Sequence, residues 1–137
     1  MPEAVERNAD TTTWAKSIAA ITLFAEDLET TKRFYREVFD LPVVFETEDS
    51  AVFKIGNTLI NLLAVASAPE LIDPAKVARP ESGSRFQFTV DVDDVDAMCE
   101  RLTRRGVKLL NGPMDRPWGV RTASFRDPAG HIWEIAR

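Results

Sequence analysis

The chain has 137 residues, enough for one domain, and a formal net charge of −5. Its single Cys and single His exclude an intrachain disulfide and a zinc site built from Cys and His side chains. The acidic balance disfavours nucleic acid as a partner. No apolar run reaches the roughly 20 residues that span a bilayer, and the N-terminus lacks the pattern of a signal peptide. We therefore expect a cytoplasmic protein whose partners include neither nucleic acid nor a membrane.

The acidic excess lies in the first half of the chain. Residues 1–66 hold 11 acidic and 6 basic side chains, whereas residues 67–137 hold 11 of each. Such an excess favours solubility, and the alternative is an acidic patch near a site for a cationic ligand. Residues 1–17 are predicted to be a flexible N-terminal arm, and Trp14 is expected to pin the end of that arm to the body.

The first elements in chain order are a strand over 18–25 and a helix over 28–39. The strand segment is apolar and favours β-structure. Asp27 suits the N-cap position of the helix, because its carboxylate can accept from free backbone N–H groups. The apolar residues that follow recur at spacings of three and four, and Pro42 ends the helix.

The same pattern returns 67 residues later. Apolar and polar residues alternate over 86–92, which predicts a half-buried strand. Asp94 then occupies the position of Asp27 and is expected to cap a helix with Cys99 on its buried face, where a thiol behaves as a small hydrophobe. Gly106 suits the left-handed residue that ends such a helix.

Three short strands are predicted after each helix, so each half has the order β-α-β-β-β. The predicted ranges are 42–47, 51–55 and 58–65 in the first half, and 107–110, 120–126 and 132–136 in the second, with a turn over 111–119. The expected fold is one α+β domain over 18–137, composed of module one (18–66), a linker with a short helical turn (67–84) and module two (85–137). Neither module can bury a secure core alone, so the two curved sheets are expected to pack together or against a partner chain, with helices outside.

Three segments carry a resemblance to a known family: AEDLETTKRFYREVFDLP, VDVDDVDAMCERL and PWGVRTASFRDPAGHIWEIAR. In this order they resemble the vicinal oxygen chelate superfamily, which includes glyoxalase I, extradiol dioxygenases, fosfomycin-resistance enzymes and bleomycin-resistance proteins. The resemblance covers roughly residues 18–137. It implies a cup formed by two βαβββ modules.

That superfamily usually holds a divalent metal in the cup with His and Glu ligands. The resemblance places the four ligand positions at Ala20, Asn61, Gln87 and Glu134. Alanine cannot coordinate a metal, and neutral amides are poor ligands for divalent cations. We therefore expect no metal and no other cofactor, and a weakly held divalent metal is the alternative.

Strand alternation extends this set to the side chains that share a face with the four positions. The predicted ligand-binding residues are Ala20, Thr22, Phe24, Leu59, Asn61, Leu63, Arg85, Gln87, Thr89, Trp118 and Glu134. Trp118 comes from the predicted turn, where it can stack on a planar ligand while Asp115 or Arg116 pairs with a charge on that ligand.

Two residues of the last segment leave alternatives open. Glu134 is either a strand residue that is solvated or paired with Arg85, or the candidate catalytic group, acting as a base or as an anchor for a ligand amine. His131 lies in the Asp-Pro-Ala-Gly-His turn, and we expect it to bond backbone groups there.

The leading functional hypothesis is a small-molecule binding protein similar to the bleomycin-resistance branch. It would sequester a hydrophobic or planar ligand, such as an antibiotic, without a metal, and would act as a homodimer. The alternative is a lyase, isomerase or dioxygenase of the same superfamily that uses Glu134 with an atypical metal site. An accessory domain without a ligand is a third possibility, so the sequence leaves open whether the protein is an enzyme.

Overall fold

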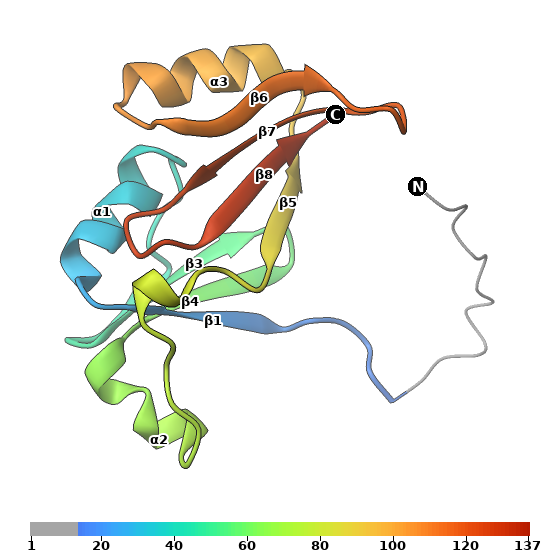
Figure 1. Ribbon diagram of the computed structural model, residues 1–137. Helices are drawn as coiled ribbons and strands as arrows, with labels where there is room; N and C mark the ends of the chain where they lie inside the picture. Colours follow the sequence, from blue (N-terminus) through green and yellow to red (C-terminus); the bar gives the residue numbers. More distant parts are fainter. Residues whose placement is uncertain (1–13) are drawn as a thin grey trace.

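The computed structural model describes residues 14–137, which form two four-stranded sheets with one long helix each (Figure 1). The first sheet has the order β1 (Ala20–Ala25), β4 (Thr58–Ala64), β3 (Ser50–Ile55), β2 (Phe45–Glu46), and its helix is α1 (Leu28–Glu37). The second has the order β5 (Gln87–Asp91), β8 (Ile132–Ala136), β7 (Arg121–Arg126), β6 (Leu109–Asp115), and its helix is α3 (Val95–Arg104). The predicted α+β fold of two βαβββ modules is confirmed.

Equivalent strands pair in the same way in both modules. β1 runs parallel to β4, β5 runs parallel to β8, and the remaining neighbours are antiparallel. The chain between β4 and β5 forms η2 (Val65–Ser67), α2 (Pro69–Ile72) and η3 (Pro80–Ser82), and α2 confirms the helical turn predicted in the linker. None of the helices between residues 14 and 137 is long and apolar enough to cross a membrane.

Both long helices begin at the predicted aspartates. The carboxylate of Asp27 accepts a hydrogen bond from the backbone N–H of Thr30 at 3.1 Å, and that of Asp94 accepts from Ala97 at 3.0 Å. The hydrogen bonds from Thr30 hold the pKa of Asp27 below its ordinary value. The repeat of 67 residues therefore reproduces the cap as well as the helix.

Two expectations about chain segments were wrong. Trp14 is 94% exposed and does not pin the arm, most of which lies outside the described residues. The predicted turn over 111–119 is shorter, because β6 continues through Gly112 and Pro113 to Asp115. The pairing of β6 with β7 shifts register on both sides of Asn111, and an edge strand tolerates proline because one side makes no ladder bonds.

The two modules share one core, which is joined by the aromatic face of α1. The Tyr35 ring stacks on Phe53 of module one with centroids 5.6 Å apart, and it meets Trp133 of module two edge-on at 6.0 Å. Phe39 lies 5.3 Å from Trp133 and 5.6 Å from Phe125. One face of each sheet is therefore buried against helices, while side chains on the opposite face are mostly part-exposed or exposed. We call this second face the open face.

Candidate functional site

Equivalent polar pairs lie on the open faces of the two modules. In module one the Asn61 amide donates to the Thr22 hydroxyl at 3.3 Å, and in module two the Thr89 hydroxyl donates to the Glu134 carboxylate at 2.9 Å. Both pairs join the parallel strands of their sheet at matching register positions. The predicted sharing of a face within each sheet is confirmed for these side chains. No hydrogen bond links the two pairs in the described part of the chain.

The cross-strand neighbours that continue each pair over its sheet form a row of side chains, and the two rows differ in chemistry. In module one the row continues from Asn61 to Val52 and Phe45. In module two it continues from Glu134 to Ser124 and then to Asn111. Leu59 precedes Asn61 by two residues on β4 and shares its face. The Leu59 side chain is 37% exposed, and that of Phe45 is 62% exposed. Module one thus presents a largely apolar open face that carries the Asn61 amide and, opposite Leu59, the exposed Lys54. Module two presents a polar open face that carries the Glu134 carboxylate together with Asp91 and Arg126.

The donor set at the four family ligand positions does not fit a divalent metal. Ala20 has no donor atom, Asn61 and Gln87 offer neutral amides, and only Glu134 offers a carboxylate. Across residues 14–137, no group of three or more His, Cys, Asp or Glu side chains is placed to hold a metal ion. Glu134 bonds Thr89, and no ion pair with Arg85 forms within the same range.

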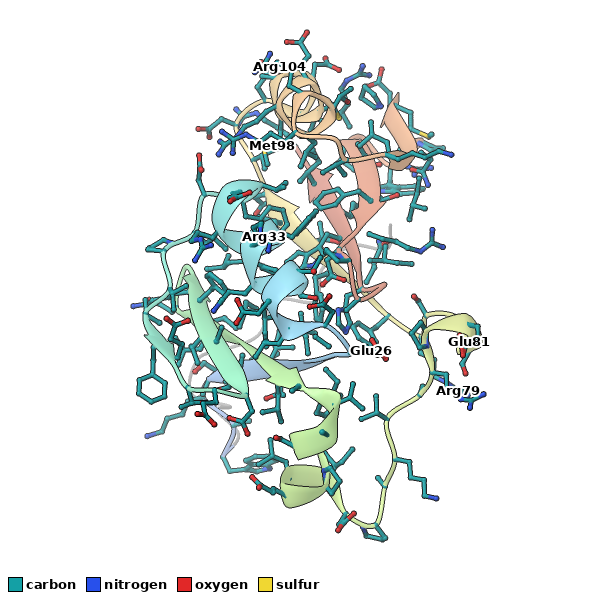
Figure 2. All side chains as sticks on the ribbon, turned by 90° about the vertical axis from the view of Figure 1, so that its left-hand side faces the viewer. Glu26, Arg33, Arg79, Glu81, Met98 and Arg104 are labelled. Atoms are coloured by element: carbon teal, nitrogen blue, oxygen red, sulfur yellow. The ribbon has the colours of Figure 1, made fainter. Side chains whose placement is uncertain are left out.

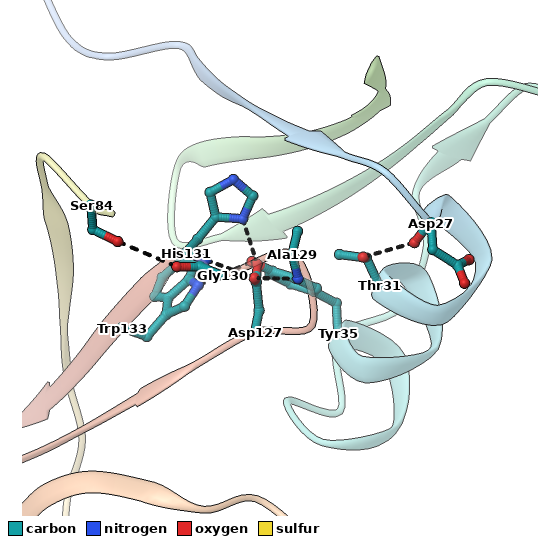
Figure 3. Close-up of polar contacts among 9 residues, drawn as sticks. All are labelled: Asp27, Thr31, Tyr35, Ser84, Asp127, Ala129, Gly130, His131 and Trp133. Atoms are coloured by element: carbon teal, nitrogen blue, oxygen red, sulfur yellow. Dashed lines mark hydrogen bonds and ion pairs between the residues drawn. The ribbon is translucent and has the colours of Figure 1, made fainter. Parts of the chain in front are cut away.

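A buried hydrogen-bond network joins the modules behind the open faces (Figure 3). The indole N–H of Trp133 donates to the Tyr35 hydroxyl at 3.0 Å, and that hydroxyl donates to Asp127 Oδ2 at 2.6 Å. The other carboxylate oxygen of Asp127 accepts from the backbone N–H groups of Ala129 and His131. Burial, followed by the charge of Asp127, raises the pKa of Tyr35 well above its ordinary value, so the phenol stays protonated and donates.

Asp127 also fixes the His131 ring. Nδ1 of His131 lies 2.8 Å from Asp127 Oδ2, and a carboxylate only accepts hydrogen bonds, so Nδ1 carries the proton. Nε2 then faces away from Asp127 (Figure 3). We expected this ring to bond backbone groups, and it bonds a buried carboxylate instead. The Asp-Pro-Ala-Gly turn is the sequence signal for this carboxylate, but no local pattern indicates Tyr35 as its partner.

A pocket of about 490 Å³ opens where the two modules meet. It lies between the end of β1, the linker before β5 and the turn that contains His131. Three of the predicted ligand-binding residues line it: Thr22, Phe24 and Arg85. A second pocket, of about 540 Å³, lies between α1, the segment after α3 and the start of β6, and contains none of the predicted residues.

Side chains of the Trp118 loop, which were predicted to contact a ligand, also contact one another and β7. Trp118 is 52% exposed, and the guanidinium of Arg116 lies over its ring at 5.9 Å from the centroid. Arg116 also bonds Thr122 and Asn111, and Asp115 pairs with Arg121. The Trp118 ring thus already contacts a cation on one face. Cys99 is buried, and burial raises the pKa of its thiol, which keeps the thiol protonated.

Comparisons with known proteins agree with this architecture. The model of the Glyoxalase/Bleomycin resistance protein/Dioxygenase superfamily matches residues 17–135. The uncharacterized protein YraH of Bacillus subtilis (strain 168) is 35% identical over 119 residues, which are 84% of this chain and 93% of that protein.

Two solved structures are similar along nearly the whole chain. A glyoxalase-related enzyme from Fulvimarina pelagi has a TM-score of 0.78 and 30% identity, covering 89% of this chain and 88% of that chain. TnmS3, an antibiotic binding protein from Streptomyces sp. CB03234, has a TM-score of 0.70 and 25% identity, covering 90% of this chain and 97% of that chain. The chain therefore belongs to the Glyoxalase/Bleomycin resistance protein/Dioxygenase superfamily.

Proposed function

We propose that this protein binds a hydrophobic or planar small molecule, such as an antibiotic, on its open faces and sequesters it without a metal. The observation that carries the proposal is the donor set Ala20, Asn61, Gln87 and Glu134, which cannot hold a divalent cation with three good ligands. Binding needs a concave apolar surface with a few placed polar groups, and it needs no reactive group. The similarity to an antibiotic binding protein supports the same class of function.

The two faces would contribute different contacts to one ligand. Phe45, Val52 and Leu59 on module one offer apolar area to a planar ring system. Glu134 on module two offers a carboxylate whose position is fixed by the Thr89 hydroxyl. An amine on the ligand would form a charge-assisted hydrogen bond with this carboxylate, so planar cations are the favoured ligand class.

Replacing Glu134 by Gln is expected to weaken the binding of proflavine, a planar cationic dye, by roughly tenfold, or about 1.4 kcal/mol. The amide keeps an acceptor for Thr89 and removes only the charge, so folding should be preserved. Fluorescence titration of proflavine measures the affinity. Glu100→Gln on α3 is the matched control, because it removes the same charge from an exposed helix position.

Two results would contradict the proposal. Equal loss of affinity in Glu134→Gln and Glu100→Gln would show that net charge, and not an anchor, attracts the dye. Stoichiometric zinc, iron, manganese or nickel in the purified protein would contradict metal-free sequestration. It would favour the alternative of a lyase, isomerase or dioxygenase, for which the oriented Glu134 carboxylate is the available base.

The proposal includes a homodimer in which module one of one copy faces module two of the other. With a two-fold axis, module one of each copy would face module two of the other copy, so the dimer would contain two such contacts. These contacts would cover Phe45 and Leu59. Sedimentation equilibrium is expected to give a mass twice that of the chain. Phe45→Glu should shift the protein toward the monomer, whereas Phe86→Glu, which lies off these faces at the linker, should not. A monomeric wild-type protein at micromolar concentration would contradict this arrangement.

A further inference from the structure

The pocket at the module junction differs in charge from the rest of the molecule. Lys76, Arg79 and Arg85 line it, and Glu26 is its one carboxylate. Figure 2 labels Glu26 between β1 and α1, and Arg79 on the linker. None of the three cations forms an ion pair in the part of the chain that the structure describes. A chain with a net charge of −5 thus concentrates unpaired positive charge at one concave site.

Aromatic rings form the apolar part of the same pocket. Phe24 comes from β1 and is partly buried, and Phe86, which directly precedes β5, is 51% exposed. The Phe86 ring lies 6.4 Å from the His131 ring at an interplanar angle of 30°. A pocket of about 490 Å³ lies within the size range of small-ligand sites, and a mixed lining of rings and a few charged groups is typical of them.

His131 supplies a polar atom of fixed orientation. The bond from Nδ1 to Asp127 holds the ring, and Asp127 is itself held by Tyr35 and two backbone N–H groups. The ring lines the pocket with Nε2 turned away from Asp127 (Figure 3). Nε2 is therefore available to a ligand without any rearrangement of the turn.

We propose that this pocket is a second binding site, which takes a small aromatic carboxylate. Arg85 and Arg79 bind the carboxylate, since a guanidinium matches it with two parallel hydrogen bonds. The ligand ring packs against Phe24 and Phe86, and Nε2 of His131 hydrogen-bonds a polar substituent. This site shares Thr22 and Phe24 with the edge of the open face of module one, but Glu134 does not line it and it takes the opposite charge, so its test is separate from that of the function proposed for the open faces.

Three probes of matched shape test the charge preference. Benzoate, benzamide and benzamidine share a planar ring and carry charges of −1, 0 and +1 respectively. Isothermal titration calorimetry at low salt uses the full chain with Glu134→Gln, which lacks the carboxylate proposed to attract planar cations to the open faces. It is expected to detect benzoate, to show benzamide at least roughly tenfold weaker, and to show no benzamidine binding. Affinities in the reverse order, or equal for all three probes, would overturn the proposal.

Variants locate the site. The double variant Arg79→Gln with Arg85→Gln is expected to lose benzoate binding by roughly tenfold or more. Arg33→Gln with Arg36→Gln, on the exposed surface of α1, removes the same charge and should leave the affinity unchanged. Glu134→Gln should also leave it unchanged. Equal losses in both double variants would overturn the assignment, because they would show that only overall charge matters.

His131→Asn tests the role of Nε2. The Asn amide can still donate to Asp127 from the position of Nδ1, so the thermal midpoint should change little, while the outer atoms of the ring are removed. Binding of salicylate, which adds a hydroxyl to the benzoate frame, is expected to weaken several-fold more than binding of benzoate. Identical losses for the two probes would show that Nε2 makes no hydrogen bond to the ligand.

Discussion

Replacing Gly112 by Ala is expected to lower the free energy of unfolding by about 3 kcal/mol or more, through two separate effects. Gly112 has a φ of +88°, a conformation that costs a residue with a Cβ roughly 1–2 kcal/mol. A Cβ at this position would also lie 2.5 Å from the carbonyl oxygen of Thr122 and 2.7 Å from the Cα of Ala123. These are backbone atoms of a central strand, so they cannot move aside as a flexible side chain can.

Gly106→Ala is the matched control for this prediction. Gly106 has a similar φ of +84°, but a Cβ there would meet nothing within 4 Å. Gly106→Ala should therefore lower the free energy of unfolding only by the cost of placing a Cβ on a left-handed backbone, about 1–2 kcal/mol. Urea denaturation of both variants measures the difference. Equal losses at the two positions would show that β6 can withdraw from β7 at the register shift without cost.

The close approach at Gly112 explains why this segment is a strand and not the turn that its composition predicts. Glycine and proline in the segment from Asn111 to Gly119 indicated a turn, since both residues are typical of turns. In the structure Gly112 serves to bring β6 against Thr122 and Ala123, and Pro113 lies on an edge strand where it replaces no ladder bond. Whether a glycine makes a turn or a close contact depends on a partner strand that a local pattern does not include.

The local features were predictable because their causes are local. The caps at Asp27 and Asp94 depend on residues three positions away, and the shared face of Thr22 with Asn61 follows from alternation once β1 and β4 are paired. The bond from Tyr35 to Asp127 joins residues 92 positions apart. Only the packing of α1 against module two brings them together, so nothing near either residue indicates the other.

The same long-range packing decides which atoms face a ligand. Because Asp127 is held by Tyr35 from the other module, His131 has one fixed hydrogen bond and one available nitrogen. The resemblance pointed to Glu134 and the open faces. The junction pocket combines three of the predicted residues, Thr22, Phe24 and Arg85, with the linker that carries Lys76 and Arg79. The contribution of the linker could be predicted only after the two modules had been placed against each other.

Tyr35→Phe is expected to lower the free energy of unfolding by about 2–3 kcal/mol at neutral pH. The variant keeps the ring and its packing against Phe53, so the loss comes from the hydroxyl alone. Without that hydroxyl, the buried indole N–H of Trp133 has no acceptor in the network and Asp127 loses one donor. A buried polar group left without a partner costs more than the net value of one hydrogen bond. Chemical denaturation at pH 7 measures the loss.

The same tyrosine should make the stability depend on alkaline pH. Its pKa is raised well above 10 in the folded protein, whereas the unfolded chain titrates near 10. Above that pH the unfolded state binds fewer protons than the folded state, so stability falls by about 1.4 kcal/mol per pH unit until the folded phenol itself ionises. The contribution is fully present below pH 10. Since the chain has one tyrosine, the absorbance of tyrosinate reports this group alone.

Comparison of wild type with Tyr35→Phe isolates this titration, because lysines and Cys99 titrate in both proteins. The stability difference between the two should be constant from pH 7 to 9 and should shrink above pH 10 by about 1.4 kcal/mol per unit. Tyrosinate absorbance of the folded wild type should remain absent until the protein unfolds, and should then appear together with the loss of structure. A free titration near pH 10 in folded protein would show that the hydroxyl is open to solvent, and would remove the basis for a network that joins the modules and orients His131 through Asp127.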